Sequence, residues 1–430
     1  MKTPRGQAKS RLVSNISVNV GPCNKYRGWH PPAGDACALD ALSLSPEWFW
    51  RDHIAPRCPA IIRQPLTDLK AARHWTYEHL VTCAGAARVS VERRGVPSEG
   101  FGHGKKVQMA FGEFVRRAAA GDELLYLTTQ QAAVGADGHA ECVASPLAEL
   151  CAAGDLPLRP ALMGNLVPQQ LNLWMGTTQT GASSGLHHDF HDNLYLLIRG
   201  RKRLRLYPPS ALEGMYTHGR PRIVHPNGRI VYAGQGDVNA DGSDAADVAA
   251  WKQRRAVDAA AVRAQPDAVE AALDAALDGF ARRGADDDRR NDWDAMDDYQ
   301  DSGTCSPSPA AACSSEQDDH PPSFSRIDLS LPPAQLRRKF PRFPGTSTAL
   351  EVDLRAGEAL YLPAGWFHEV TSFSIDAAPH MALNYWFHPP DNVDPGPQGF
   401  AAPYTSEFWP AVWAARRAHG PTSSCAGVML

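Results

Sequence analysis

The stretch SGLHHDFHDNLYLLIRGRKRLRLY, residues 184–207, decides how this chain folds. It contains a histidine and an aspartate two positions apart, His187 and Asp189, followed by two hydrophobic or alternating runs that a single glycine separates. Such runs, punctuated by glycine, predict two β-strands, at 194–199 and 202–207. The chain is therefore expected to have a β core with a histidine–aspartate pair at the entrance of one strand.

His187 and Asp189 have the spacing of a metal-binding pair. In an extended segment, residues i and i+2 project from the same face, so these two side chains converge while His188 points away. One imidazole and one carboxylate suit Fe(II), and a second histidine would complete the facial triad of non-haem iron oxygenases. Taken alone, an H-x-D triplet is more often a surface histidine beside an aspartate, so the assignment depends on further residues.

The third ligand is expected from a distant strand. His368 is the strongest candidate, because it opens a predicted strand directly after the turn at 363–365. His380 and His388, which flank the last predicted strand, are weaker candidates. His191 and the outward-facing His188 are expected to lie outside the ligand set, near the ligands or on the surface.

Lys202 adds a second signal. Along 201–206, the lysine shares its face with Leu204 and Leu206, and the arginines occupy the other face, so alternation directs Lys202 inward. A buried ammonium without a partner is costly, and no acidic residue of this strand pair obviously supplies one. The pattern therefore predicts an anionic ligand; the alternative is a lysine that extends from the strand end into solvent.

The composition of the chain limits its class. The 430 residues suffice for a large core, and no hydrophobic run approaches the roughly 20 residues that span a bilayer. A formal charge of −4 gives no general reason to expect nucleic acid or an anionic membrane as a partner. The nine cysteines contain no CxxC pair, which argues against a disulfide framework or a structural zinc module and favours a reducing compartment, the cytoplasm or the nucleus.

The remaining signals divide the chain into segments. Residues 1–34 contain no Asp or Glu but several basic residues; residues 1–43 are predicted to be a disordered basic tail, with an organellar transit segment as the alternative. A further segment, 236–320, contains 20 acidic and 8 basic residues. It is predicted to be an insertion, helical and Ala-rich at first, then acidic and disordered. The domain is expected at 44–395, followed by a C-terminal segment at 396–430.

The other predicted elements follow from hydrophobic periodicity. Strands are expected at 59–63, 87–93, 124–127, 171–175, 350–362, 368–373 and 381–387, and helical segments at 46–50, 69–85 and 109–120. Motifs on both sides of the insertion contribute to one site. One interrupted β core therefore explains the pattern better than two domains.

With these motifs in place, the chain resembles the jumonji-C (JmjC) oxygenases, most closely their small protein-hydroxylase branch. The matching motifs are Asn172-Leu-Trp174, Ser184, His187-x-Asp189, Asn193-Leu-Tyr195, Gly200-x-Lys202, Tyr207-Pro-Pro209, Gly357-Glu-x-Leu-Tyr-Leu-Pro-x-x-Trp-Phe-His368 and Asn384-Tyr-Trp386. The resemblance covers about 44–235 and 320–395. The insertion is longer than a compact family member needs.

The resemblance implies a mainly β fold with flanking helices (α+β), built on a double-stranded β-helix, the cupin or jelly-roll core. It implies Fe(II) bound by His187, Asp189 and His368, with 2-oxoglutarate and O2 as co-substrates. The implied reaction hydroxylates a protein side chain and decarboxylates 2-oxoglutarate to succinate and CO2.

The resemblance also implies the co-substrate site. The far carboxylate of 2-oxoglutarate would pair with Lys202 and accept hydrogen bonds from the hydroxyls of Ser184 and Tyr126. Asn193 and Asn384 match family positions near the co-substrate.

Several functions remain open from the sequence. A histone or protein lysine demethylase would use the same chemistry on an N-methyl group, although the cysteines of zinc-binding chromatin readers are not recognised. A catalytically inactive cupin used as a binding module, or a cupin with another metal, would not need an inward lysine. The protein substrate and the oligomeric state are not encoded in a recognisable motif.

Overall fold

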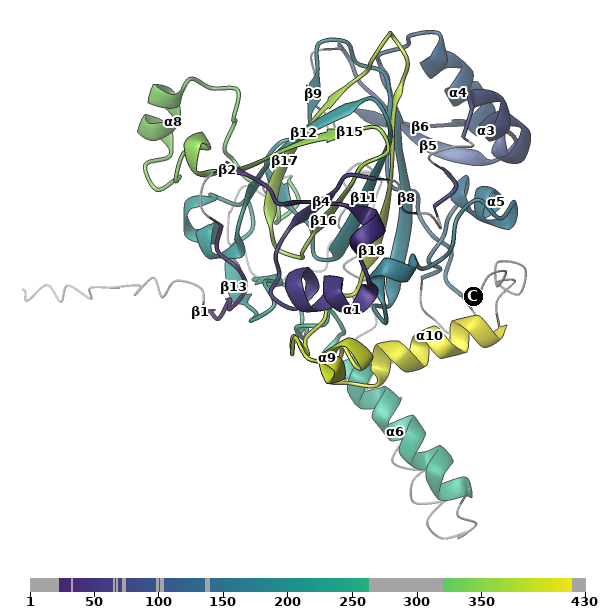
Figure 1. The fold of residues 1–430 in the computed structure, drawn as a ribbon, viewed down its shortest axis with the longest axis vertical. Coiled ribbons are helices and arrows are strands. Elements are labelled where there is room, and N and C mark those ends of the chain that lie inside the picture. The colour runs from purple at the N-terminus through teal and green to yellow at the C-terminus, as the bar shows by residue number, and fades with distance from the viewer. Residues whose placement is uncertain are drawn as a thin grey trace, which may run out of the picture.

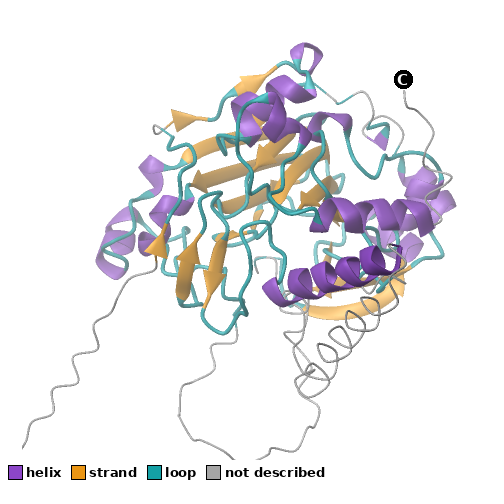
Figure 2. Ribbon diagram, turned by 90° about the horizontal axis from the view of Figure 1, so that it is seen from below, coloured by secondary structure: helices purple, strands orange, loops and turns teal. Residues whose placement is uncertain are grey.

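The structure is a computed structural model. It describes residues 23–262 and 320–419, apart from 32, 33, 65, 67, 68, 72–74, 98, 99, 101–103 and 136–139. Two large β-sheets form its centre, and helices surround them (Figures 1 and 2). The predicted mainly β architecture with flanking helices is therefore confirmed.

The larger sheet has nine strands. In spatial order the strands are β3 (Ala38–Leu39), β4 (Ala60–Ile62), β16 (Ala359–Leu362), β11 (Asp192–Arg199), β18 (His380–Phe387), β8 (Pro168–Gly176), β7 (Leu125–Leu127), β5 (Arg88–Arg93) and β6 (Lys105–Ala110). Strands from both sides of the insertion alternate in this sheet, which shows one β core rather than two domains.

The smaller sheet has six strands and carries most of the site. Its order is β10 (His187–His188), β17 (Phe367–Phe373), β12 (Arg201–Tyr207), β15 (Leu350–Arg355) and β2 (Gly34–Asp35), with β9 (Ala182–Ser183) also paired to β17. A third, three-stranded sheet contains β1 (Cys23–Asn24), β13 (Pro221–Val224) and β14 (Ile230–Tyr232).

The inner faces of the two large sheets share one hydrophobic core. Ile61 and Leu360 of the nine-stranded sheet belong to the same buried cluster as Leu204 and Val352 of the six-stranded sheet. Because the two sheets face each other over these side chains, they enclose an interior, as expected for a cupin-type double-stranded β-helix.

Helices lie around the sheets, and α3, α4 and α5 cover the outside of the nine-stranded sheet. The helices are α1 (Pro46–Phe49), α3 (Tyr77–Ala84), α4 (Phe111–Ala119), α5 (Leu147–Ala152), α6 (Ala245–Val262), α8 (Pro333–Lys339), α9 (Pro397–Ala401) and α10 (Phe408–His419), with short helical turns at Ala41–Ser43, Trp50–Ile54, Ala161–Met163, Pro209–Gly214 and Thr346–Thr348. Leu80, Phe114 and Leu150 of α3, α4 and α5 pack into one core with the sheet. Figure 1 shows these three helices together beside β5 and β6.

The alternation predicted for β12 is confirmed. Lys202 and Leu204 are buried, whereas Arg201 and Arg203 are exposed. On the outer face, Arg201 forms an ion pair with Asp353 of β15 at 2.7 Å. The strand therefore has one face of apolar residues and a single lysine, and one face of arginines.

Two predicted elements were too long. The helix expected at 69–85 is interrupted at Trp75 and Thr76, and α3 begins at Tyr77, where the hydroxyl of Thr76 accepts a hydrogen bond from the backbone N–H of His79 and so caps the helix. The single strand expected at 350–362 is two strands, β15 and β16. Gly357, with φ +88°, adopts the left-handed conformation of the turn between them.

The predicted disordered tail was also too long. Residues 23–43 include β1, β2 and β3, which pair with β13, β15 and β4. These pairings satisfy backbone groups at sheet edges and so order the segment. The rest of the tail, 1–22, lies outside the described residues.

The first part of the predicted insertion is helical, as expected. α6 begins at Ala245, and its base is packed into the main core through Val248 and Ala250. Figure 1 shows the rest of α6 projecting away from the sheets. The predicted acidic, disordered part lies outside the described residues.

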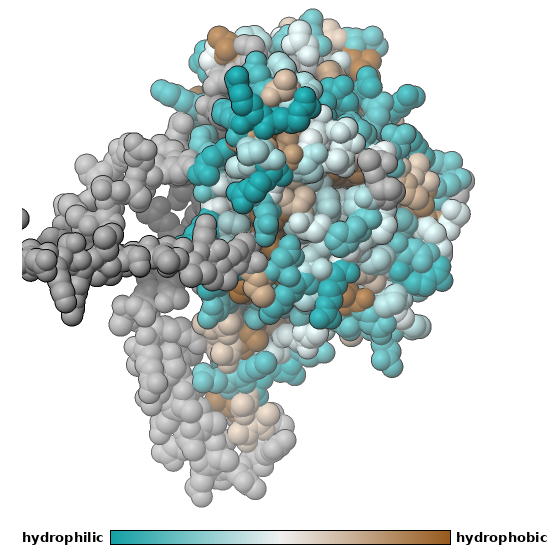
Figure 3. All heavy atoms as spheres, turned by 90° about the vertical axis from the view of Figure 1, so that its left-hand side faces the viewer, coloured by the Kyte–Doolittle hydropathy of each residue, from teal (hydrophilic) through white to brown (hydrophobic). Residues whose placement is uncertain are grey.

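The face of the molecule drawn in Figure 3 is mainly polar. Figure 3 shows the face that lies to the left in Figure 1, where hydrophobic side chains occur in small groups among hydrophilic ones. Among the described helices, none combines the length and hydropathy that crossing a bilayer requires.

Candidate metal centre

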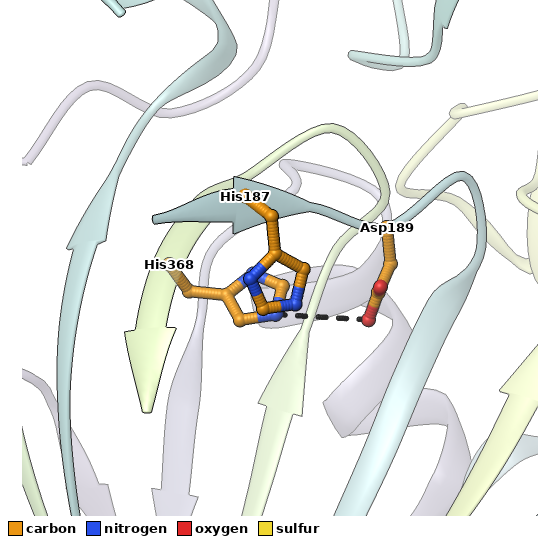
Figure 4. A group of neighbouring side chains, drawn as sticks. All are labelled: His187, Asp189 and His368. Atoms are coloured by element: carbon orange, nitrogen blue, oxygen red, sulfur yellow. Dashed lines mark ion pairs between the residues drawn. The ribbon is translucent and has the colours of Figure 1, made fainter. Parts of the chain in front are cut away.

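Three side chains from two strands of the six-stranded sheet meet at one point. His187 lies in β10, Asp189 follows it directly, and His368 lies in β17. Each offers a ligand atom, and these atoms lie within 4.8 Å of one another. Figure 4 shows the three side chains pointing toward a common centre. The structure thus brings together the three residues that the sequence singled out.

Strand pairing creates this meeting point. β10 and β17 are antiparallel, and their register places His187 directly opposite His368. Directly opposite residues of an antiparallel pair project from the same face. The chain then turns after Asp189, whose carbonyl oxygen accepts a hydrogen bond from Gly365 N at 2.9 Å.

His188 faces the other way, as alternation predicts. Its Nε2 lies 2.7 Å from the hydroxyl of Tyr232, and its Nδ1 lies 3.2 Å from the carbonyl oxygen of Asp189. Burial lowers the pKa of His188 to about 3. It is therefore a neutral core histidine with both ring nitrogens satisfied, and not a surface residue.

Backbone carbonyls orient both histidine ligands. Nδ1 of His187 lies 3.0 Å from the carbonyl oxygen of Gly185, and Nδ1 of His368 lies 2.9 Å from that of Trp366. A carbonyl oxygen only accepts hydrogen bonds, so each Nδ1 carries the proton. Each Nε2 keeps its lone pair for a metal, and the contact to the backbone fixes the ring orientation.

The electrostatics also suit a cation. Burial and the neighbouring His368 lower the pKa of His187 to about 4, which keeps its imidazole neutral. Burial alone would raise the pKa of Asp189, but His368 and His187 hold that pKa below its usual value. Neutral imidazole and ionised carboxylate are the protonation states that metal binding requires.

Asn193 and Asn384 form a polar chain that ends on Asp189. Asn193 Nδ2 donates to Asp189 Oδ2 at 3.4 Å, and Asn384 Nδ2 donates to Asn193 Oδ1 at 3.3 Å. The indole N–H of Trp174 donates to Asn384 Oδ1 at 2.9 Å. The two asparagines that the family resemblance singled out therefore support the carboxylate through hydrogen bonds.

Lys202 lies in the interior of the barrel with a side chain that is only 1% exposed. Its Nζ donates to Ser372 Oγ at 2.5 Å, and Ser372 is the residue opposite it on β17. Burial lowers the pKa of Lys202 to about 7. Within the part of the chain that the structure describes, Lys202 forms no ion pair, and the anionic ligand expected from the sequence stays a prediction.

Tyr126 and Ser184 occupy different positions relative to this lysine. Tyr126 packs against Ala182, and Ala182 lies opposite Ser372 on β17, so Tyr126 is close to the residue that bonds Lys202. Ser184 Oγ donates to the carbonyl oxygen of Gly185 at 3.0 Å and accepts from Val370 N at 3.1 Å. Backbone groups thus already use the hydroxyl of Ser184.

Two contributors were missed from the sequence. Alternation along 368–373 puts Ser372 on the same face as His368, but no motif marks a role for it. Phe324, which follows the insertion, stacks on the ring of His187 with centroids 4.7 Å apart and planes 11° apart. Backbone pairing holds this segment in place: Phe324 bridges to His187, and Ser325 N donates to the carbonyl oxygen of Leu186 at 2.8 Å. Hydrophobic periodicity in the sequence cannot identify a single residue, such as Phe324, that pairs with a distant strand.

The other candidate histidines do not join the triad. His380 is fully buried beside Tyr126, with ring centroids 5.8 Å apart. His388 stacks on Trp409, and His191 lies 6.1 Å from His388, measured between ring centroids. None of them belongs to the cluster of possible metal ligands among the described residues. The donor set is thus two imidazoles and one carboxylate, which fits Fe(II) with positions left open.

Comparisons with known proteins agree with this geometry. Residues 46–393 match the family model of the cupin-like domain. The chain is 32% identical to the JmjC domain-containing protein 4 of Schizosaccharomyces pombe, over 91% of this chain and 92% of that protein.

More distant relatives carry functional names. The chain is 25% identical to the human bifunctional peptidase and (3S)-lysyl hydroxylase JMJD7, over 39% of this chain and 52% of that protein. It is 24% identical to the lysine-specific demethylase JMJ32 of Arabidopsis thaliana, over 51% of this chain and 42% of that protein.

Proposed function

Because this chain belongs to the cupin-like JmjC family, we propose that it is an Fe(II)- and 2-oxoglutarate-dependent oxygenase that hydroxylates a side chain of a protein. The observation that carries the proposal is the combination of two features in one interior. A histidine–aspartate–histidine cluster lies in the same barrel as a buried lysine that forms no ion pair within the described residues. A structural cupin needs neither.

The metal would be held by Nε2 of His187 and His368 and by the carboxylate of Asp189. Bound there, Fe(II) would supply the redox chemistry that couples O2 and 2-oxoglutarate to hydroxylation, with succinate and CO2 as co-products. The carbonyls of Gly185 and Trp366 orient the two imidazoles.

Lys202 would bind the far carboxylate of 2-oxoglutarate. Placing a carboxylate beside Nζ forms a charge-assisted pair in a region of low dielectric, which restores the charged state of the lysine. Ser372 already holds Nζ in place. Tyr126 lies near the same region and would donate its hydroxyl to this carboxylate. Ser184 is the second proposed hydroxyl donor, and it would have to replace one of its hydrogen bonds to the backbone by one to the ligand.

The sheets themselves exclude water from this interior. Leu204, Leu360 and Ala382 are buried in the shared core, so a bound co-substrate would be surrounded by apolar side chains except at Lys202 and the triad. Electrostatic contacts are stronger in such an environment than in water. The barrel thus supplies orientation and a dry site.

A lysine demethylase is the second candidate. It would use the same residues on an N-methyl group, and one of the relatives above bears a demethylase name while another bears a lysyl hydroxylase name. The complete triad disfavours the third candidate, an inactive cupin that serves as a binding module.

Mass spectrometry of the products distinguishes these functions. The purified chain, Fe(II) and 2-oxoglutarate would be incubated with fractionated protein extract. Hydroxylation adds one oxygen atom to a protein, whereas demethylation removes one CH2 group and releases formaldehyde. A peptide library would be incubated in the same way. If succinate forms but no protein or peptide gains an oxygen atom or loses a CH2 group, the proposed hydroxylation of proteins is wrong. We propose a protein partner in the cytoplasm or nucleus, on the sequence grounds given above.

A further inference from the structure

Arg57 and Asp192 form a buried ion pair outside the ligand set. Their side chains are 1% and 0% exposed. Arg57 Nη1 donates to Asp192 Oδ2 at 2.8 Å, and Nη2 donates to Oδ1. Taking two charges out of water is costly, and such a pair is often no more stabilising than apolar residues of the same size. A role other than stability would explain why the chain contains it.

The pair connects several segments. Asp192 also accepts hydrogen bonds from the hydroxyl of Tyr361 at 2.7 Å and from Ala364 N at 3.0 Å. Arg57 Nε donates to the carbonyl oxygen of Asn227 at 2.9 Å. The carboxylate thus has four donors around it, which leaves little freedom for the groups that it joins.

Two of these segments carry the ligands. Asp192 lies three residues after Asp189 and directly precedes Asn193, which donates to the Asp189 carboxylate. Ala364 lies in the turn that leads from β16 into β17 and His368, and Gly365 of that turn donates to the carbonyl oxygen of Asp189. One carboxylate therefore holds the segment after Asp189 against the turn before His368.

The backbone of Arg57 points to the same conclusion. Its φ is +62°, a left-handed conformation that favours glycine. It follows the helical turn Trp50–Ile54, and Arg57 N and Cys58 N donate to the carbonyl oxygens of Ile54 and His53. This is the helix-terminating motif in which glycine is usual. A strained arginine at such a position indicates that the side chain is needed.

We propose that Arg57 and Asp192 are positioning residues that fix the spacing between the Asp189 segment and the His368 segment, and thereby the metal affinity. The inference rests on the proposed function, because it assumes that the triad binds a metal. Neither residue belongs to the cluster of possible ligands, so the pair would act through the two segments.

Co(II) binding to the full chain tests this proposal. Co(II) serves as the probe because its visible absorption reports ligand geometry. The main variant is the double substitution Arg57→Gly with Asp192→Asn, which removes both charges and also relieves the left-handed strain. Arg63→Met is the matched control, because Arg63 forms an ion pair with Glu358 at 2.8 Å and touches neither ligand segment. Circular dichroism and thermal melts check that each variant is folded.

The expected result is a folded double variant with about tenfold or greater loss of Co(II) affinity and a changed absorption spectrum, while Arg63→Met matches the wild type. Unchanged affinity and spectrum in the folded double variant would overturn the inference, as would an equal loss in Arg63→Met. If the double variant does not fold, Tyr361→Phe decides: a severalfold loss of affinity supports the inference, and no change overturns it. If the wild-type chain binds no Co(II), the proposed function fails first and the inference with it.

Discussion

His187 and His368 lie directly opposite each other on the antiparallel strands β10 and β17, although a large part of the chain separates them in sequence. Both rings use Nδ1 on a backbone carbonyl and direct Nε2 toward Asp189. His368 Nε2 lies 3.7 Å from Asp189 Oδ2. The pairing of two strands, rather than a local motif, therefore determines whether the triad exists.

Removing the carboxylate ligand should abolish activity without unfolding the protein. We expect Asp189→Ala to eliminate succinate formation and the rise in melting temperature on addition of Fe(II) or Mn(II), because two imidazoles alone bind these cations weakly. Asp353→Ala, which breaks the outer ion pair with Arg201, is the control. Undiminished succinate from pure Asp189→Ala would exclude the proposed site.

Replacing Lys202 should stabilise the ligand-free protein and weaken its binding of 2-oxoglutarate. Lys202→Met removes a buried ammonium, so the ligand-free protein should melt at a higher temperature than the wild type. Its affinity for 2-oxoglutarate should fall about 10- to 100-fold, since a charge-assisted hydrogen bond contributes about 1.5–3 kcal/mol. Thermal melts measure the first effect and calorimetric titration the second, with Arg203→Met on the exposed face of β12 as the control. A lower melting temperature together with normal affinity would contradict both parts.

The affinity for 2-oxoglutarate should depend on pH. Burial lowers the pKa of Lys202 to about 7, and a bound carboxylate favours the ammonium, so binding above pH 7 should take up a proton. The affinity should be highest below pH 7 and fall about tenfold per pH unit above it. Titrations in buffers of different ionisation enthalpy measure the uptake. Lys202→Arg should remove the dependence, because arginine stays charged; a flat profile in the wild type would refute the idea.

The same pKa predicts how stability varies with pH. An unfolded lysine keeps its proton up to about pH 10.4, whereas the folded, ligand-free protein loses it near pH 7. Between these values the unfolded state binds more protons, so the stability of the wild type relative to Lys202→Met should rise with pH. The gain should disappear as pH falls through 7. Denaturant titrations of the ligand-free proteins at pH 6 to 9 would show the trend or its absence.

Phe324 should matter for metal binding although it is not a ligand. Its ring covers one face of His187, so Phe324→Ala should let the imidazole rotate and weaken Co(II) binding about tenfold. Phe324→Tyr should keep the stack and the affinity. Phe343→Ala, another aromatic truncation in the neighbouring hydrophobic cluster, controls for loss of packing. Equal affinities for Phe324→Ala and the wild type would show that the stack has no positioning role.

Substituting the two serines near the proposed co-substrate site should show which one contributes more to the binding of 2-oxoglutarate. Ser372 holds Lys202 Nζ, whereas Ser184 is bonded to backbone groups. We expect Ser372→Ala to raise the KM for 2-oxoglutarate severalfold and Ser184→Ala to change it less. Succinate assays at varied 2-oxoglutarate concentration measure both. The reverse order would mean that the hydroxyl of Ser184 turns toward the ligand on binding.

The side-chain directions around the triad could be predicted because period-two alternation is a local property. It directed His187 and Lys202 inward and His188 outward, and the register of β10, β12 and β17 agrees. The turn at 363–365, directly before the predicted strand, is why His368 was preferred over His380. The chemistry of the site was thus accessible from short segments.

What the sequence could not predict depends on contacts between distant segments. Arg57 has no local signal for its buried partner Asp192, and Phe324 pairs with His187 through a single bridge. The helix expected at 69–85 is not continuous, because Trp75 and Thr76 break it before α3; Leu69 and Trp75 are both buried in the common core, which gives helix-like hydrophobic spacing without a single helix. Tertiary packing determined each of these features.

The short strand β10 has a consequence for how the protein is made. Both of its neighbours, β17 and the bridge at Phe324, come from beyond residue 320. A nascent chain that has emerged only as far as the insertion therefore cannot order His187, however much of the nine-stranded sheet it has synthesised. Closing such distant contacts is slow. A metal could then bind at the proposed site only after translation has delivered β17, so metal uptake would report that strands from both sides of the insertion have paired.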